Sequence, residues 1–393
     1  METVGIITVH HYGNYGSALQ AYASQRVFEK LGYDVFIIDY RSPNAYYATG
    51  RFMKYEDKDD SFYRRIERRS VNPVTRFIGN VLSEPHIARF LYRRFGVRRG
   101  IRLWNFWLDN LRMTRRYDSL KELFADPPHF DIYVVGGDQL WNTFITYNNP
   151  AYFLAFADKG AKKISFSTSI GIPHIPDEAL PAFRRGIANL SAILLREDEG
   201  VKYLQSLGFE AERVLDPTLM LTGNEWLKMQ DRHFKLPFEK YVLVYILDPS
   251  DWTVELTERV RKQTGLPIIV IGRRKNTVAS DGYLYVGNIE VATFITLFAN
   301  AEIVVTNSFH GMAFTVIFGK VLVATYRSEE TDVSMNSRFR NLVGMLNLSH
   351  CLYNRSNFST EKLSLLMDYD RINTLLETYR RQSLDLLKRA LSQ

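Results

Sequence analysis

Four short segments place polar side chains beside glycine where an apolar run ends, a pattern typical of ligand sites in α/β proteins. The segment best suited to acid–base chemistry is Asn307-Ser308-Phe309-His310-Gly311. Ser308 favours a helix N-cap, which places His310 in the first turn, at the positive end of the helix dipole. A neutral imidazole is favoured there until an anion binds and allows it to act as an acid. A lone histidine is more often structural, but this setting predicts a functional one.

A second segment, Gly136-Gly137-Asp138-Gln139-Leu140-Trp141-Asn142, combines close backbone packing with several hydrogen-bonding groups. The two glycines bring the chain tight against the sheet. Asp138, Gln139 and Asn142 offer polar side chains to a ligand, and Trp141 offers a flat face on which a sugar ring could pack. The alternative is a turn held by Asp138 with Trp141 in the core. The clustering of polar groups favours the functional interpretation.

Two further segments suit an anionic ligand. The loop from His10 to Ser17 contains two glycines, and the helix expected after it presents N–H groups to an anion. The loop lacks the GxGxxG pattern, so nothing here indicates a nicotinamide cofactor. Arg196 closes an apolar run, and its planar guanidinium could clamp a carboxylate or a phosphate. The alternative is an arginine paired with a local acid, and the acids that follow it suit the first turn of a helix.

Short apolar runs alternate with helical stretches along the chain, which predicts parallel sheets with crossover helices. In the first half we expect strands at Val4–Val9, Tyr33–Asp39, Asp131–Val135, Lys163–Thr168 and Ala192–Leu195. In the second half we expect strands at Tyr241–Leu247, Leu266–Ile271, Glu302–Thr306 and Val321–Tyr326, helices at Thr253–Gln263 and Val291–Ala299, and a terminal helix at Asp370–Leu391. The predicted fold is α/β, with two Rossmann-like domains that face a cleft and are hinged at Leu219–Glu239. In such sheets ligands bind beyond the carboxyl ends of the strands.

The composition is that of a globular protein large enough for two domains. The 393 residues are 46% hydrophobic and 24% charged, and the net charge is +7. The single cysteine, Cys351, excludes a disulfide framework and a thiolate-rich metal site, and it indicates a reducing compartment. The N-terminus does not resemble a signal peptide. Ile303–Gly319 is too short and too polar for a membrane span, so we expect a buried strand that runs into a helix.

The positive charge is concentrated in residues 61–116. This segment contains fourteen arginines, no lysine and three acids, a local balance of +11, together with nine aromatic residues. Such a composition suits anionic lipid headgroups. It suits nucleic acid less well, because no zinc-finger, RNP or helix-turn-helix signature accompanies it. The alternative is a helical insertion over residues 50–120 whose aromatic residues are core and whose arginines are solvated or paired with acids.

Six motifs, taken in order, resemble the polysaccharide pyruvyl transferase family. They are Asn14-Tyr15-Gly16, Gly137-Asp138-Gln139-Leu140-Trp141-Asn142, Ser165-Phe166-Ser167, Arg196-Glu197, Asp216-Pro217-Thr218 and Asn307-Ser308-Phe309-His310-Gly311. The resemblance runs from about Gly5 to Leu346. It implies a GT-B-like fold and the transfer of a pyruvyl or enolpyruvyl unit from phosphoenolpyruvate to sugar hydroxyls. The usual product in this family is a cyclic pyruvate ketal on a hexose of a cell-surface polysaccharide.

The resemblance also implies roles for individual residues. The family's histidine corresponds to His310 and its strand-end arginine to Arg196. We expect His310 to exchange protons or bind the phosphate, Arg196 to clamp the donor, and Asp138 with Trp141 to orient the sugar. Some members carry a basic residue where this chain has Ser308, so a second cation must come from Arg327, Arg338 or Lys320. The other expected substrate-binding residues are Asn14, Tyr15, Gly16, Gln139, Asn142, Asn307, Ser308 and Gly311.

Residues 1–220 are expected to form an acceptor-side domain, and residues 221–393 a donor-side domain that includes the terminal helix. The expected partners are phosphoenolpyruvate and a sugar or lipid-linked oligosaccharide acceptor, with no metal, no resident cofactor and no nucleic acid. The expected location is cytoplasmic, peripheral at the inner face of the membrane if residues 61–116 contact lipid. Two rival functions fit the same fold: a glycosyltransferase with a nucleotide-sugar donor, and a non-catalytic protein that binds an anionic glycan.

Overall fold

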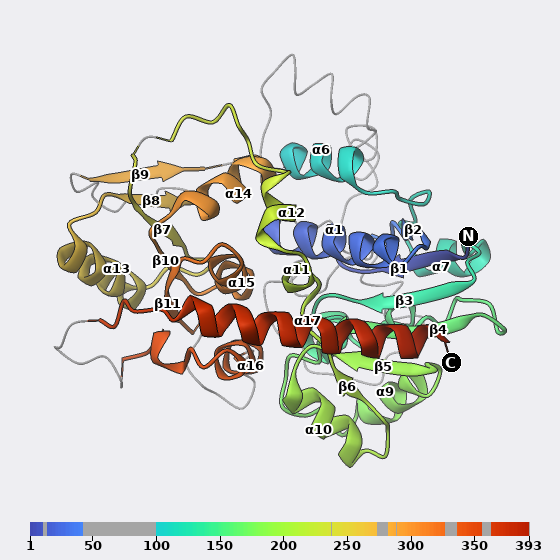
Figure 1. Cartoon of the computed structure of the whole chain (residues 1–393). Helices are drawn as coiled ribbons and strands as arrows, with labels where there is room; N and C mark the ends of the chain where they lie inside the picture. Colours follow the sequence, from blue (N-terminus) through green and yellow to red (C-terminus); the bar gives the residue numbers. More distant parts are fainter. Residues whose placement is uncertain are drawn as a thin grey trace. The chain divides into compact units, whose positions relative to one another are not determined.

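The computed structural model describes residues 1–10, 14–41, 100–236, 238–272, 282–287, 289–326, 336–355 and 363–392. Contacts divide the chain into two compact units. Unit 1 comprises Met1–Pro217 and Gln382–Gln393, and unit 2 comprises Thr218–Arg381. Each unit contains one parallel sheet with helices around it (Figure 1).

The sheet of unit 1 has six strands in the order β2-β1-β3-β4-β5-β6, and every neighbouring pair is parallel. The strands are β1 (Thr3–Ile7), β2 (Asp34–Ile37), β3 (Ile132–Gly136), β4 (Lys162–Thr168), β5 (Ala192–Leu195) and β6 (Glu212–Arg213). The first five coincide with predicted strands within a few residues. The sixth was not predicted, because two charged residues show no apolar run.

The helices of unit 1 follow the strands as crossover connections. They are α1 (Tyr15–Lys30), α6 (Gly100–Asn110), α7 (Leu120–Ala125), α8 (Thr143–Thr146), the 3₁₀-helix η1 (Pro150–Phe153), α9 (Leu180–Ile187) and α10 (Asp198–Ser206). The short helix α11 (Pro217–Met220) begins at the boundary between the units. All residues of β3 are buried. Because a strand that is covered on both faces needs apolar residues at successive positions, β3 appears in the sequence as a continuous apolar run.

Unit 2 repeats this architecture. Its six-stranded sheet has the order β12-β11-β10-β7-β8-β9, again with parallel neighbours. The strands are β7 (Val242–Tyr245), β8 (Ile268–Ile271), β9 (Tyr283–Val286), β10 (Ile303–Thr306), β11 (Val321–Thr325) and β12 (Leu352–Tyr353). The other elements are α12 (Gly223–Leu227), α13 (Asp251–Thr264), α14 (Val291–Asn300), α15 (Phe309–Ile317), α16 (Ser337–Met345), η2 (Ser349–Cys351) and α17 (Tyr369–Ser392).

Local sequence signals account for several of these boundaries. The Ser250 side chain caps α13, and Thr253 returns the bond in a capping box, while Gly265 ends the helix with a φ of 69°. Ile303–Gly319 forms β10 and then α15, as predicted for a buried strand that runs into a helix. None of the described helices combines the length and the apolarity needed to cross a bilayer.

The terminal helix departs from the predicted domain boundary. We predicted that all of it belongs to the domain formed by residues 221–393. Contacts instead assign Gln382–Gln393, the end of α17, to unit 1. Inside unit 1 the Ser383 hydroxyl accepts a hydrogen bond from the Leu215 N–H at 2.9 Å, with both residues buried. Helical periodicity defines such a helix but does not show which sheet its last turns cover.

Most of the arginine-rich segment lies outside the described residues, which resume at Gly100. The described end forms α6, and its Phe106 and Trp107 are buried, with the Phe106 ring against Tyr22 on α1. Three arginines near this end have acidic partners: Arg112 with Asp34, Arg115 with Asp126, and Arg116 with Asp118. These described side chains therefore match the alternative of core aromatics and paired arginines.

Candidate functional site

Unit 1 gathers polar side chains along the carboxyl edge of its sheet. In sheet order, the residues after the strands include Asp39, His10, Asp138, Ser169, Arg196 and Asp216. Parallel strands bring these positions to one edge. Five of the six are buried, whereas the Asp138 side chain is 18% exposed. Within this set Asp138 is the group most open to a ligand.

Asp138 is held from three elements. Its Oδ1 accepts the Gln139 N–H at 2.8 Å and lies 3.7 Å from Arg196 Nη2 after β5. Its Oδ2 accepts the Ser17 hydroxyl, in the first turn of α1, at 3.3 Å. A carboxylate that is both oriented and accessible meets the geometric requirement for a base that takes a proton from a hydroxyl.

The two glycines before Asp138 permit this placement. A Cβ on Gly136 would lie 1.8 Å from the Phe166 carbonyl oxygen on β4. A Cβ on Gly137 would lie 1.8 Å from Gln20 Oε1 on α1, and the φ of this residue is 89°. The prediction that these glycines bring the chain tight against its neighbours is confirmed. Any larger residue would push β3 away from β4 and α1.

Arg196 is buried among carboxylates rather than open to a donor. Its guanidinium donates to Asp216 Oδ2 at 2.7 Å and faces Asp138, and the side chain is 2% exposed. Burial lowers the pKa of this guanidinium, but the charges of Asp216, Asp138 and Glu197 outweigh burial and raise it. The expectation that Arg196 clamps the donor does not fit this structure, because three carboxylates already oppose its charge. The alternative of an arginine paired with acids describes it.

Trp141 is a core residue, and the prediction that it offers a face to a sugar is wrong for this structure. Its side chain is fully buried. The ring stacks on Phe153 at 5.9 Å and meets Phe183 edge-on, and its Nε1–H donates to the Tyr152 carbonyl at 2.9 Å. A sugar could reach this ring only if η1 moved away.

Gln139 and Asn142 stabilise the turn after β3. Asn142 is the N-cap of α8 and is fully buried, and its Nδ2 donates to Gln139 Oε1 at 3.0 Å. Gln139 in turn packs against Gly171, where a Cβ would lie 2.1 Å from Oε1. Asn142 therefore has a structural role here, and Gln139 is half-buried beside Asp138.

The loop after β1 is described only from Asn14. Asn14 is the N-cap of α1, and its side chain accepts the Gly16 N–H at 2.9 Å. Tyr15 and Gly16 are buried in the first turn of α1. The helix expected after this loop is present and begins at Tyr15, before the expected end of the loop at Ser17, and contact of these three residues with a substrate stays a prediction. His11, Tyr12 and Gly13 lie outside the described residues.

A buried ionic cluster at the same edge was not predicted. His10 Nε2 lies 3.0 Å from Asp39 Oδ1, and its Nδ1 lies 3.2 Å from the Thr8 carbonyl. Arg41 donates to both oxygens of Asp39, at 2.7 and 2.8 Å. Burial opposes ionisation of Asp39, but the hydrogen bonds and charges of His10 and Arg41 outweigh it and hold its pKa well below the usual range. Asp39 is the last residue of a predicted strand. This position is the sequence signal that could have identified it as a candidate site residue.

In unit 2 the predicted motif lies where β10 ends and α15 begins. Ser308 is the N-cap, and its hydroxyl accepts the Gly311 N–H at 3.3 Å, which confirms the predicted cap. His310 occupies the first turn and is 6% exposed, with its ring edge-on to Phe309. Gly311 packs on Thr306, where a Cβ would lie 2.2 Å from the hydroxyl oxygen. The motif thus presents an imidazole beside helix N–H groups.

Asn307 has a structural role in this motif. Its Oδ1 accepts the Leu247 N–H at 2.7 Å, and its Nδ2 donates to the Asp248 carbonyl at 3.3 Å. The side chain is fully buried. These bonds tie the segment after β7 to the start of α15, so Asn307 supports the site instead of facing a ligand.

Of the three candidates for a second cation, Arg338 shares a neighbour with His310. Its guanidinium carbon is 5.8 Å from the centre of the Phe309 ring, and the centre of that ring is 5.3 Å from the centre of the His310 ring. Lys320 is excluded because it precedes β11, at the amino edge of the sheet, whereas His310 follows β10 at the carboxyl edge. A strand rises about 3.3 Å per residue, so the two edges are on the order of 15 Å apart. Arg327 lies outside the described residues.

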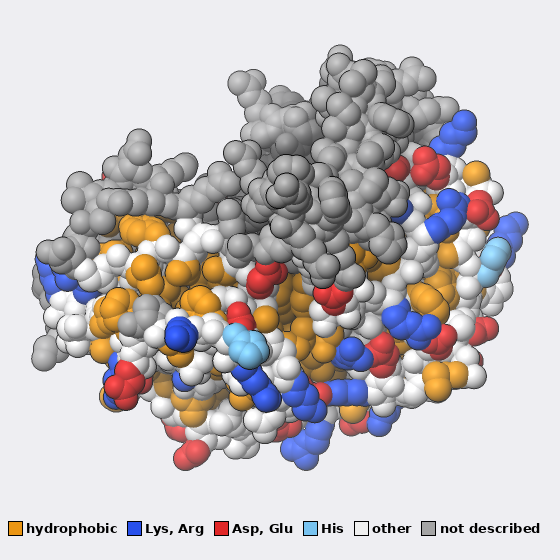
Figure 2. Space-filling model, turned by 90° about the horizontal axis from the view of Figure 1, so that it is seen from above, with side chains coloured by type: hydrophobic (Ala, Val, Ile, Leu, Met, Phe, Trp, Pro, Cys, Tyr) orange, Lys and Arg blue, Asp and Glu red, His pale blue; other side chains and the backbone are white. Residues whose placement is uncertain are grey.

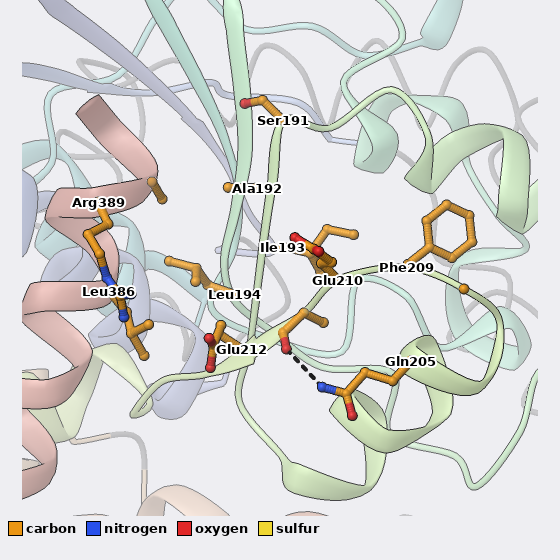
Figure 3. Close-up of a pocket in the computed structure, with 13 residues that line it drawn as sticks. Ser191, Ala192, Ile193, Leu194, Gln205, Phe209, Glu210, Glu212, Leu386 and Arg389 are labelled. Atoms are coloured by element: carbon orange, nitrogen blue, oxygen red, sulfur yellow. Dashed lines mark hydrogen bonds between the residues drawn. The ribbon is translucent and has the colours of Figure 1, made fainter. Parts of the chain in front are cut away.

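Within the described ranges, no three His, Cys, Asp or Glu side chains are grouped as a metal site requires. A hollow of about 640 Å³ lies between the start of β5, the chain after α10 and the last turns of α17 (Figure 3). Its walls include Ser191, Leu194, Phe209, Glu212 and Arg389. It contains none of the predicted site residues.

On the face in Figure 2, the described residues do not show one dominant charge, because basic and acidic side chains are interspersed among apolar ones. Unit 1 also has surface ion pairs, such as Arg115 with Asp126 and Arg213 with Asp198. The predicted lipid-binding segment, residues 61–116, falls mainly on residues 61–99, outside the described residues, and stays a prediction.

The sequence comparison decides the family. The family model for polysaccharide pyruvyl transferase matches residues 14–329, which include Asp138, Arg196 and His310. The chain belongs to the polysaccharide pyruvyl transferase family. It is therefore a transferase of polysaccharide biosynthesis that moves a pyruvyl group. No curated protein matches the chain in sequence.

Solved structures support the GT-B-like fold. UDP-GlcNAc 2-epimerase from Neisseria meningitidis, bound to UDP-GlcNAc, is similar with a TM-score of 0.50 and 9% identity, over 100% of this chain and 99% of that chain. A putative UDP-N-acetylglucosamine 2-epimerase from Listeria monocytogenes also gives 0.50 and 9% identity, over 98% and 95% of the two chains. Together with two parallel six-stranded sheets, these similarities confirm two Rossmann-like domains. At this identity they show the fold alone, and the cleft between the domains stays a prediction.

Proposed function

We propose that this pyruvyl transferase takes the pyruvyl unit from phosphoenolpyruvate and attaches it to two hydroxyls of a hexose as a cyclic ketal. The family match over residues 14–329 carries the proposal. Each unit adds support at the carboxyl edge of its sheet: an accessible carboxylate in unit 1, and in unit 2 an imidazole and a guanidinium that both lie against Phe309.

The donor side is proposed in unit 2. Phosphoenolpyruvate carries a phosphate and a carboxylate, so its site needs positive charge and N–H donors. The N-terminus of α15 supplies N–H groups and a dipole suited to an anion, and His310 lies in its first turn. Arg338 is the proposed second cation, because Phe309 lies against both its guanidinium and the His310 ring. His310 either protonates the donor's methylene carbon or holds its phosphate.

The acceptor side is proposed in unit 1, where Asp138 takes the proton of an attacking sugar hydroxyl. Its carboxylate is accessible, and its orientation is fixed by Ser17, the Gln139 N–H and Arg196. Arg196 then acts on Asp138 and not on the donor. General acid–base assistance of this kind is worth about 10²–10⁴-fold in rate.

The proposed reaction balances without a further reagent. A proton adds to C3 of phosphoenolpyruvate, and the first hydroxyl oxygen forms a bond to C2 as its proton passes to Asp138. The bond between C2 and the phosphate oxygen breaks, and inorganic phosphate leaves with its electron pair. The second hydroxyl oxygen then bonds to C2, and its proton passes to the released phosphate, which closes the ketal.

The test is incubation of the full chain with phosphoenolpyruvate and hexose-containing oligosaccharides. Formation of the ketal adds the mass of pyruvate less one water to the acceptor and releases phosphate in equal amount. A parallel incubation with sugar nucleotides measures nucleotide release. Nucleotide release without phosphate release would identify a glycosyltransferase instead, and acceptor binding without either product would identify a glycan-binding protein.

We further propose that the acceptor is a lipid-linked oligosaccharide, modified at the cytoplasmic face of the membrane. The composition of residues 61–99, the part of the arginine-rich segment outside the described residues, supports this, because arginine and aromatic residues together suit an anionic lipid surface. Cosedimentation with vesicles that contain anionic lipid, at low and high salt, tests it. Salt-sensitive binding is expected, and no binding at low salt would contradict the proposal.

A further inference from the structure

Glu197 is a buried carboxylate, and one of its oxygens accepts hydrogen bonds from a single loop. It is 1% exposed, at the end of β5. Its Oε1 accepts three hydrogen bonds, from the Ser169 hydroxyl at 2.9 Å, the Ile170 N–H at 2.8 Å and the Gly171 N–H at 3.2 Å. A buried carboxylate is costly unless it is well hydrogen-bonded, and all three of these bonds come from one loop.

This loop fixes the backbone of the proposed base. The Ser169 N–H donates to the Asp138 carbonyl at 3.0 Å, and the Ser169 carbonyl accepts the Trp141 N–H at 3.2 Å. Gly171 packs directly against the Gln139 side chain, with no room for a Cβ. The loop from Ser169 to Gly171 therefore braces the chain from Asp138 to Trp141, and Glu197 braces the loop.

The loop leaves its strand through a strained residue. Ser167 in β4 has a φ of 56°, in the left-handed region, where the pairing with β5 shifts register between Phe166 and Thr168. Such a conformation persists only when its surroundings hold it. The Arg196 N–H donates to the Thr168 carbonyl at 3.1 Å, and the adjacent Glu197 binds the next three residues. The Arg196-Glu197 pair thus holds the loop immediately after the bulge.

We infer that Glu197 is a positioning residue for Asp138, acting through the loop from Ser169 to Gly171. The inference rests on the proposed function, in which Asp138 takes the hydroxyl proton. Loss of the Glu197 acceptor frees three donors, lets the loop move and displaces the Asp138 carboxylate. Misplacement of a reacting group by about 1 Å can cost 10²-fold in rate.

The kinetic test compares Glu197→Ala with Glu197→Gln, and uses Glu199→Ala as a matched control on the exposed first turn of α10. Glu197→Ala is expected to lower kcat about 100-fold with the KM for phosphoenolpyruvate unchanged. Glu197→Gln keeps an acceptor oxygen for the loop and is expected to stay within about 5-fold of the wild type. In an Asp138→Asn background, Glu197→Ala should cost only a few-fold more, because its effect passes through Asp138.

Two kinetic results would overturn the inference: a wild-type kcat for Glu197→Ala, or an equal loss in Glu197→Gln, which would assign the effect to charge. Crystal structures of the wild type and Glu197→Ala provide a readout independent of activity. We expect the Ser169 N–H to separate from the Asp138 carbonyl and Asp138 to leave Ser17. If both contacts persist, the inference fails. If they break while the wild type shows no pyruvyl transfer, the proposed function fails and the positioning stands.

Discussion

The Arg196 guanidinium donates to the Asp216 carboxylate across 2.7 Å, and both side chains are buried. Asp138, the carboxylate that a ligand can reach, lies 3.7 Å from the same guanidinium. The arginine that the family pattern singles out therefore lies between two aspartates at the edge of the sheet of unit 1, one buried and one accessible. Because of this arrangement, the expected effect of removing Arg196 is not simply the loss of donor binding.

Replacing Arg196 should lower the stability of the fold more than it lowers activity. Arg196→Met leaves the Asp216 carboxylate buried without its cation, and breaking a buried pair in this way costs about 3–5 kcal/mol. Removing the charge of the partner as well, in Arg196→Met with Asp216→Asn, should recover part of that loss. Urea denaturation of the two variants and the wild type measures it. Equal stability of Arg196→Met and the wild type would show that the pair contributes nothing.

Replacing His310 should affect turnover. His310→Gln keeps a polar side chain of similar size in the first turn of α15 but removes the titratable group. We expect kcat to fall about 10²–10⁴-fold, the usual contribution of general acid–base catalysis. His350→Gln, at an exposed position of unit 2, is the control. Phosphate release near the wild-type rate would remove His310 from the mechanism.

Arg338 should act on donor affinity. Arg338→Met keeps the apolar stem against Phe309 and removes the cation. The KM for phosphoenolpyruvate should rise about 10- to 100-fold, the equivalent of the ~1.5–3 kcal/mol that a hydrogen bond to a charged group contributes. Arg340→Met, on the same helix, is the matched control. If both variants have the wild-type KM, the second cation lies elsewhere.

Gly137 should tolerate no side chain. Gly137→Ala places a methyl group against Gln20, and overpacking of this kind costs about 1–3 kcal/mol. Gly208→Ala is the control, because Gly208 has a φ of 86°, close to the 89° of Gly137, but open space around it. The difference in unfolding free energy between the two variants isolates the packing term. Equal losses would attribute the need for glycine to the backbone alone.

The Asp39 cluster should make stability depend on pH in a defined direction. The folded-state pKa of Asp39 lies below the unfolded value of about 3.9, so its stabilisation is complete above that pH. It is lost as the pH falls through the folded-state pKa. Asp39→Asn should therefore be less stable than the wild type at pH 7, and the gap should shrink progressively below about pH 4. Denaturation curves at several pH values, with the exposed Asp109→Asn as control, measure the gap. A gap that is constant with pH would contradict the assignment.

Strands such as β3, β7 and β10 could be predicted from sequence because each is a largely apolar run whose residues are all buried. Strands β6 and β12 have two residues each, too few for any period to show. Strand β9 reads Tyr-Leu-Tyr-Val with every position half-buried, and a short run of this kind fits several structures. The helix caps at Asn14 and Ser308 were predictable, since a cap depends on neighbours along the chain.

The site was less predictable, because side-chain direction depends on partners far along the sequence. The sequence around Trp141 is compatible with a ring that faces a ligand and with a ring in the core. In the structure its contacts with Phe153 and Phe183 place the ring in the core. In the sequence, the position of Arg196 fits an anion clamp. In the structure its guanidinium instead donates to Asp216, which lies twenty residues later in the chain. The rule that ligands bind beyond the carboxyl ends of parallel strands located these positions. It did not show which of their side chains point outward.

The return of α17 to unit 1 determines how that unit can be produced by itself. A gene fragment ending at Pro217 would omit Ser383 and leave the buried Leu215 N–H without its acceptor. It would also omit Leu387 and Leu391, which are buried. Expression of unit 1 by itself therefore calls for residues 382–393 to be joined to it through a linker, or supplied as a separate peptide.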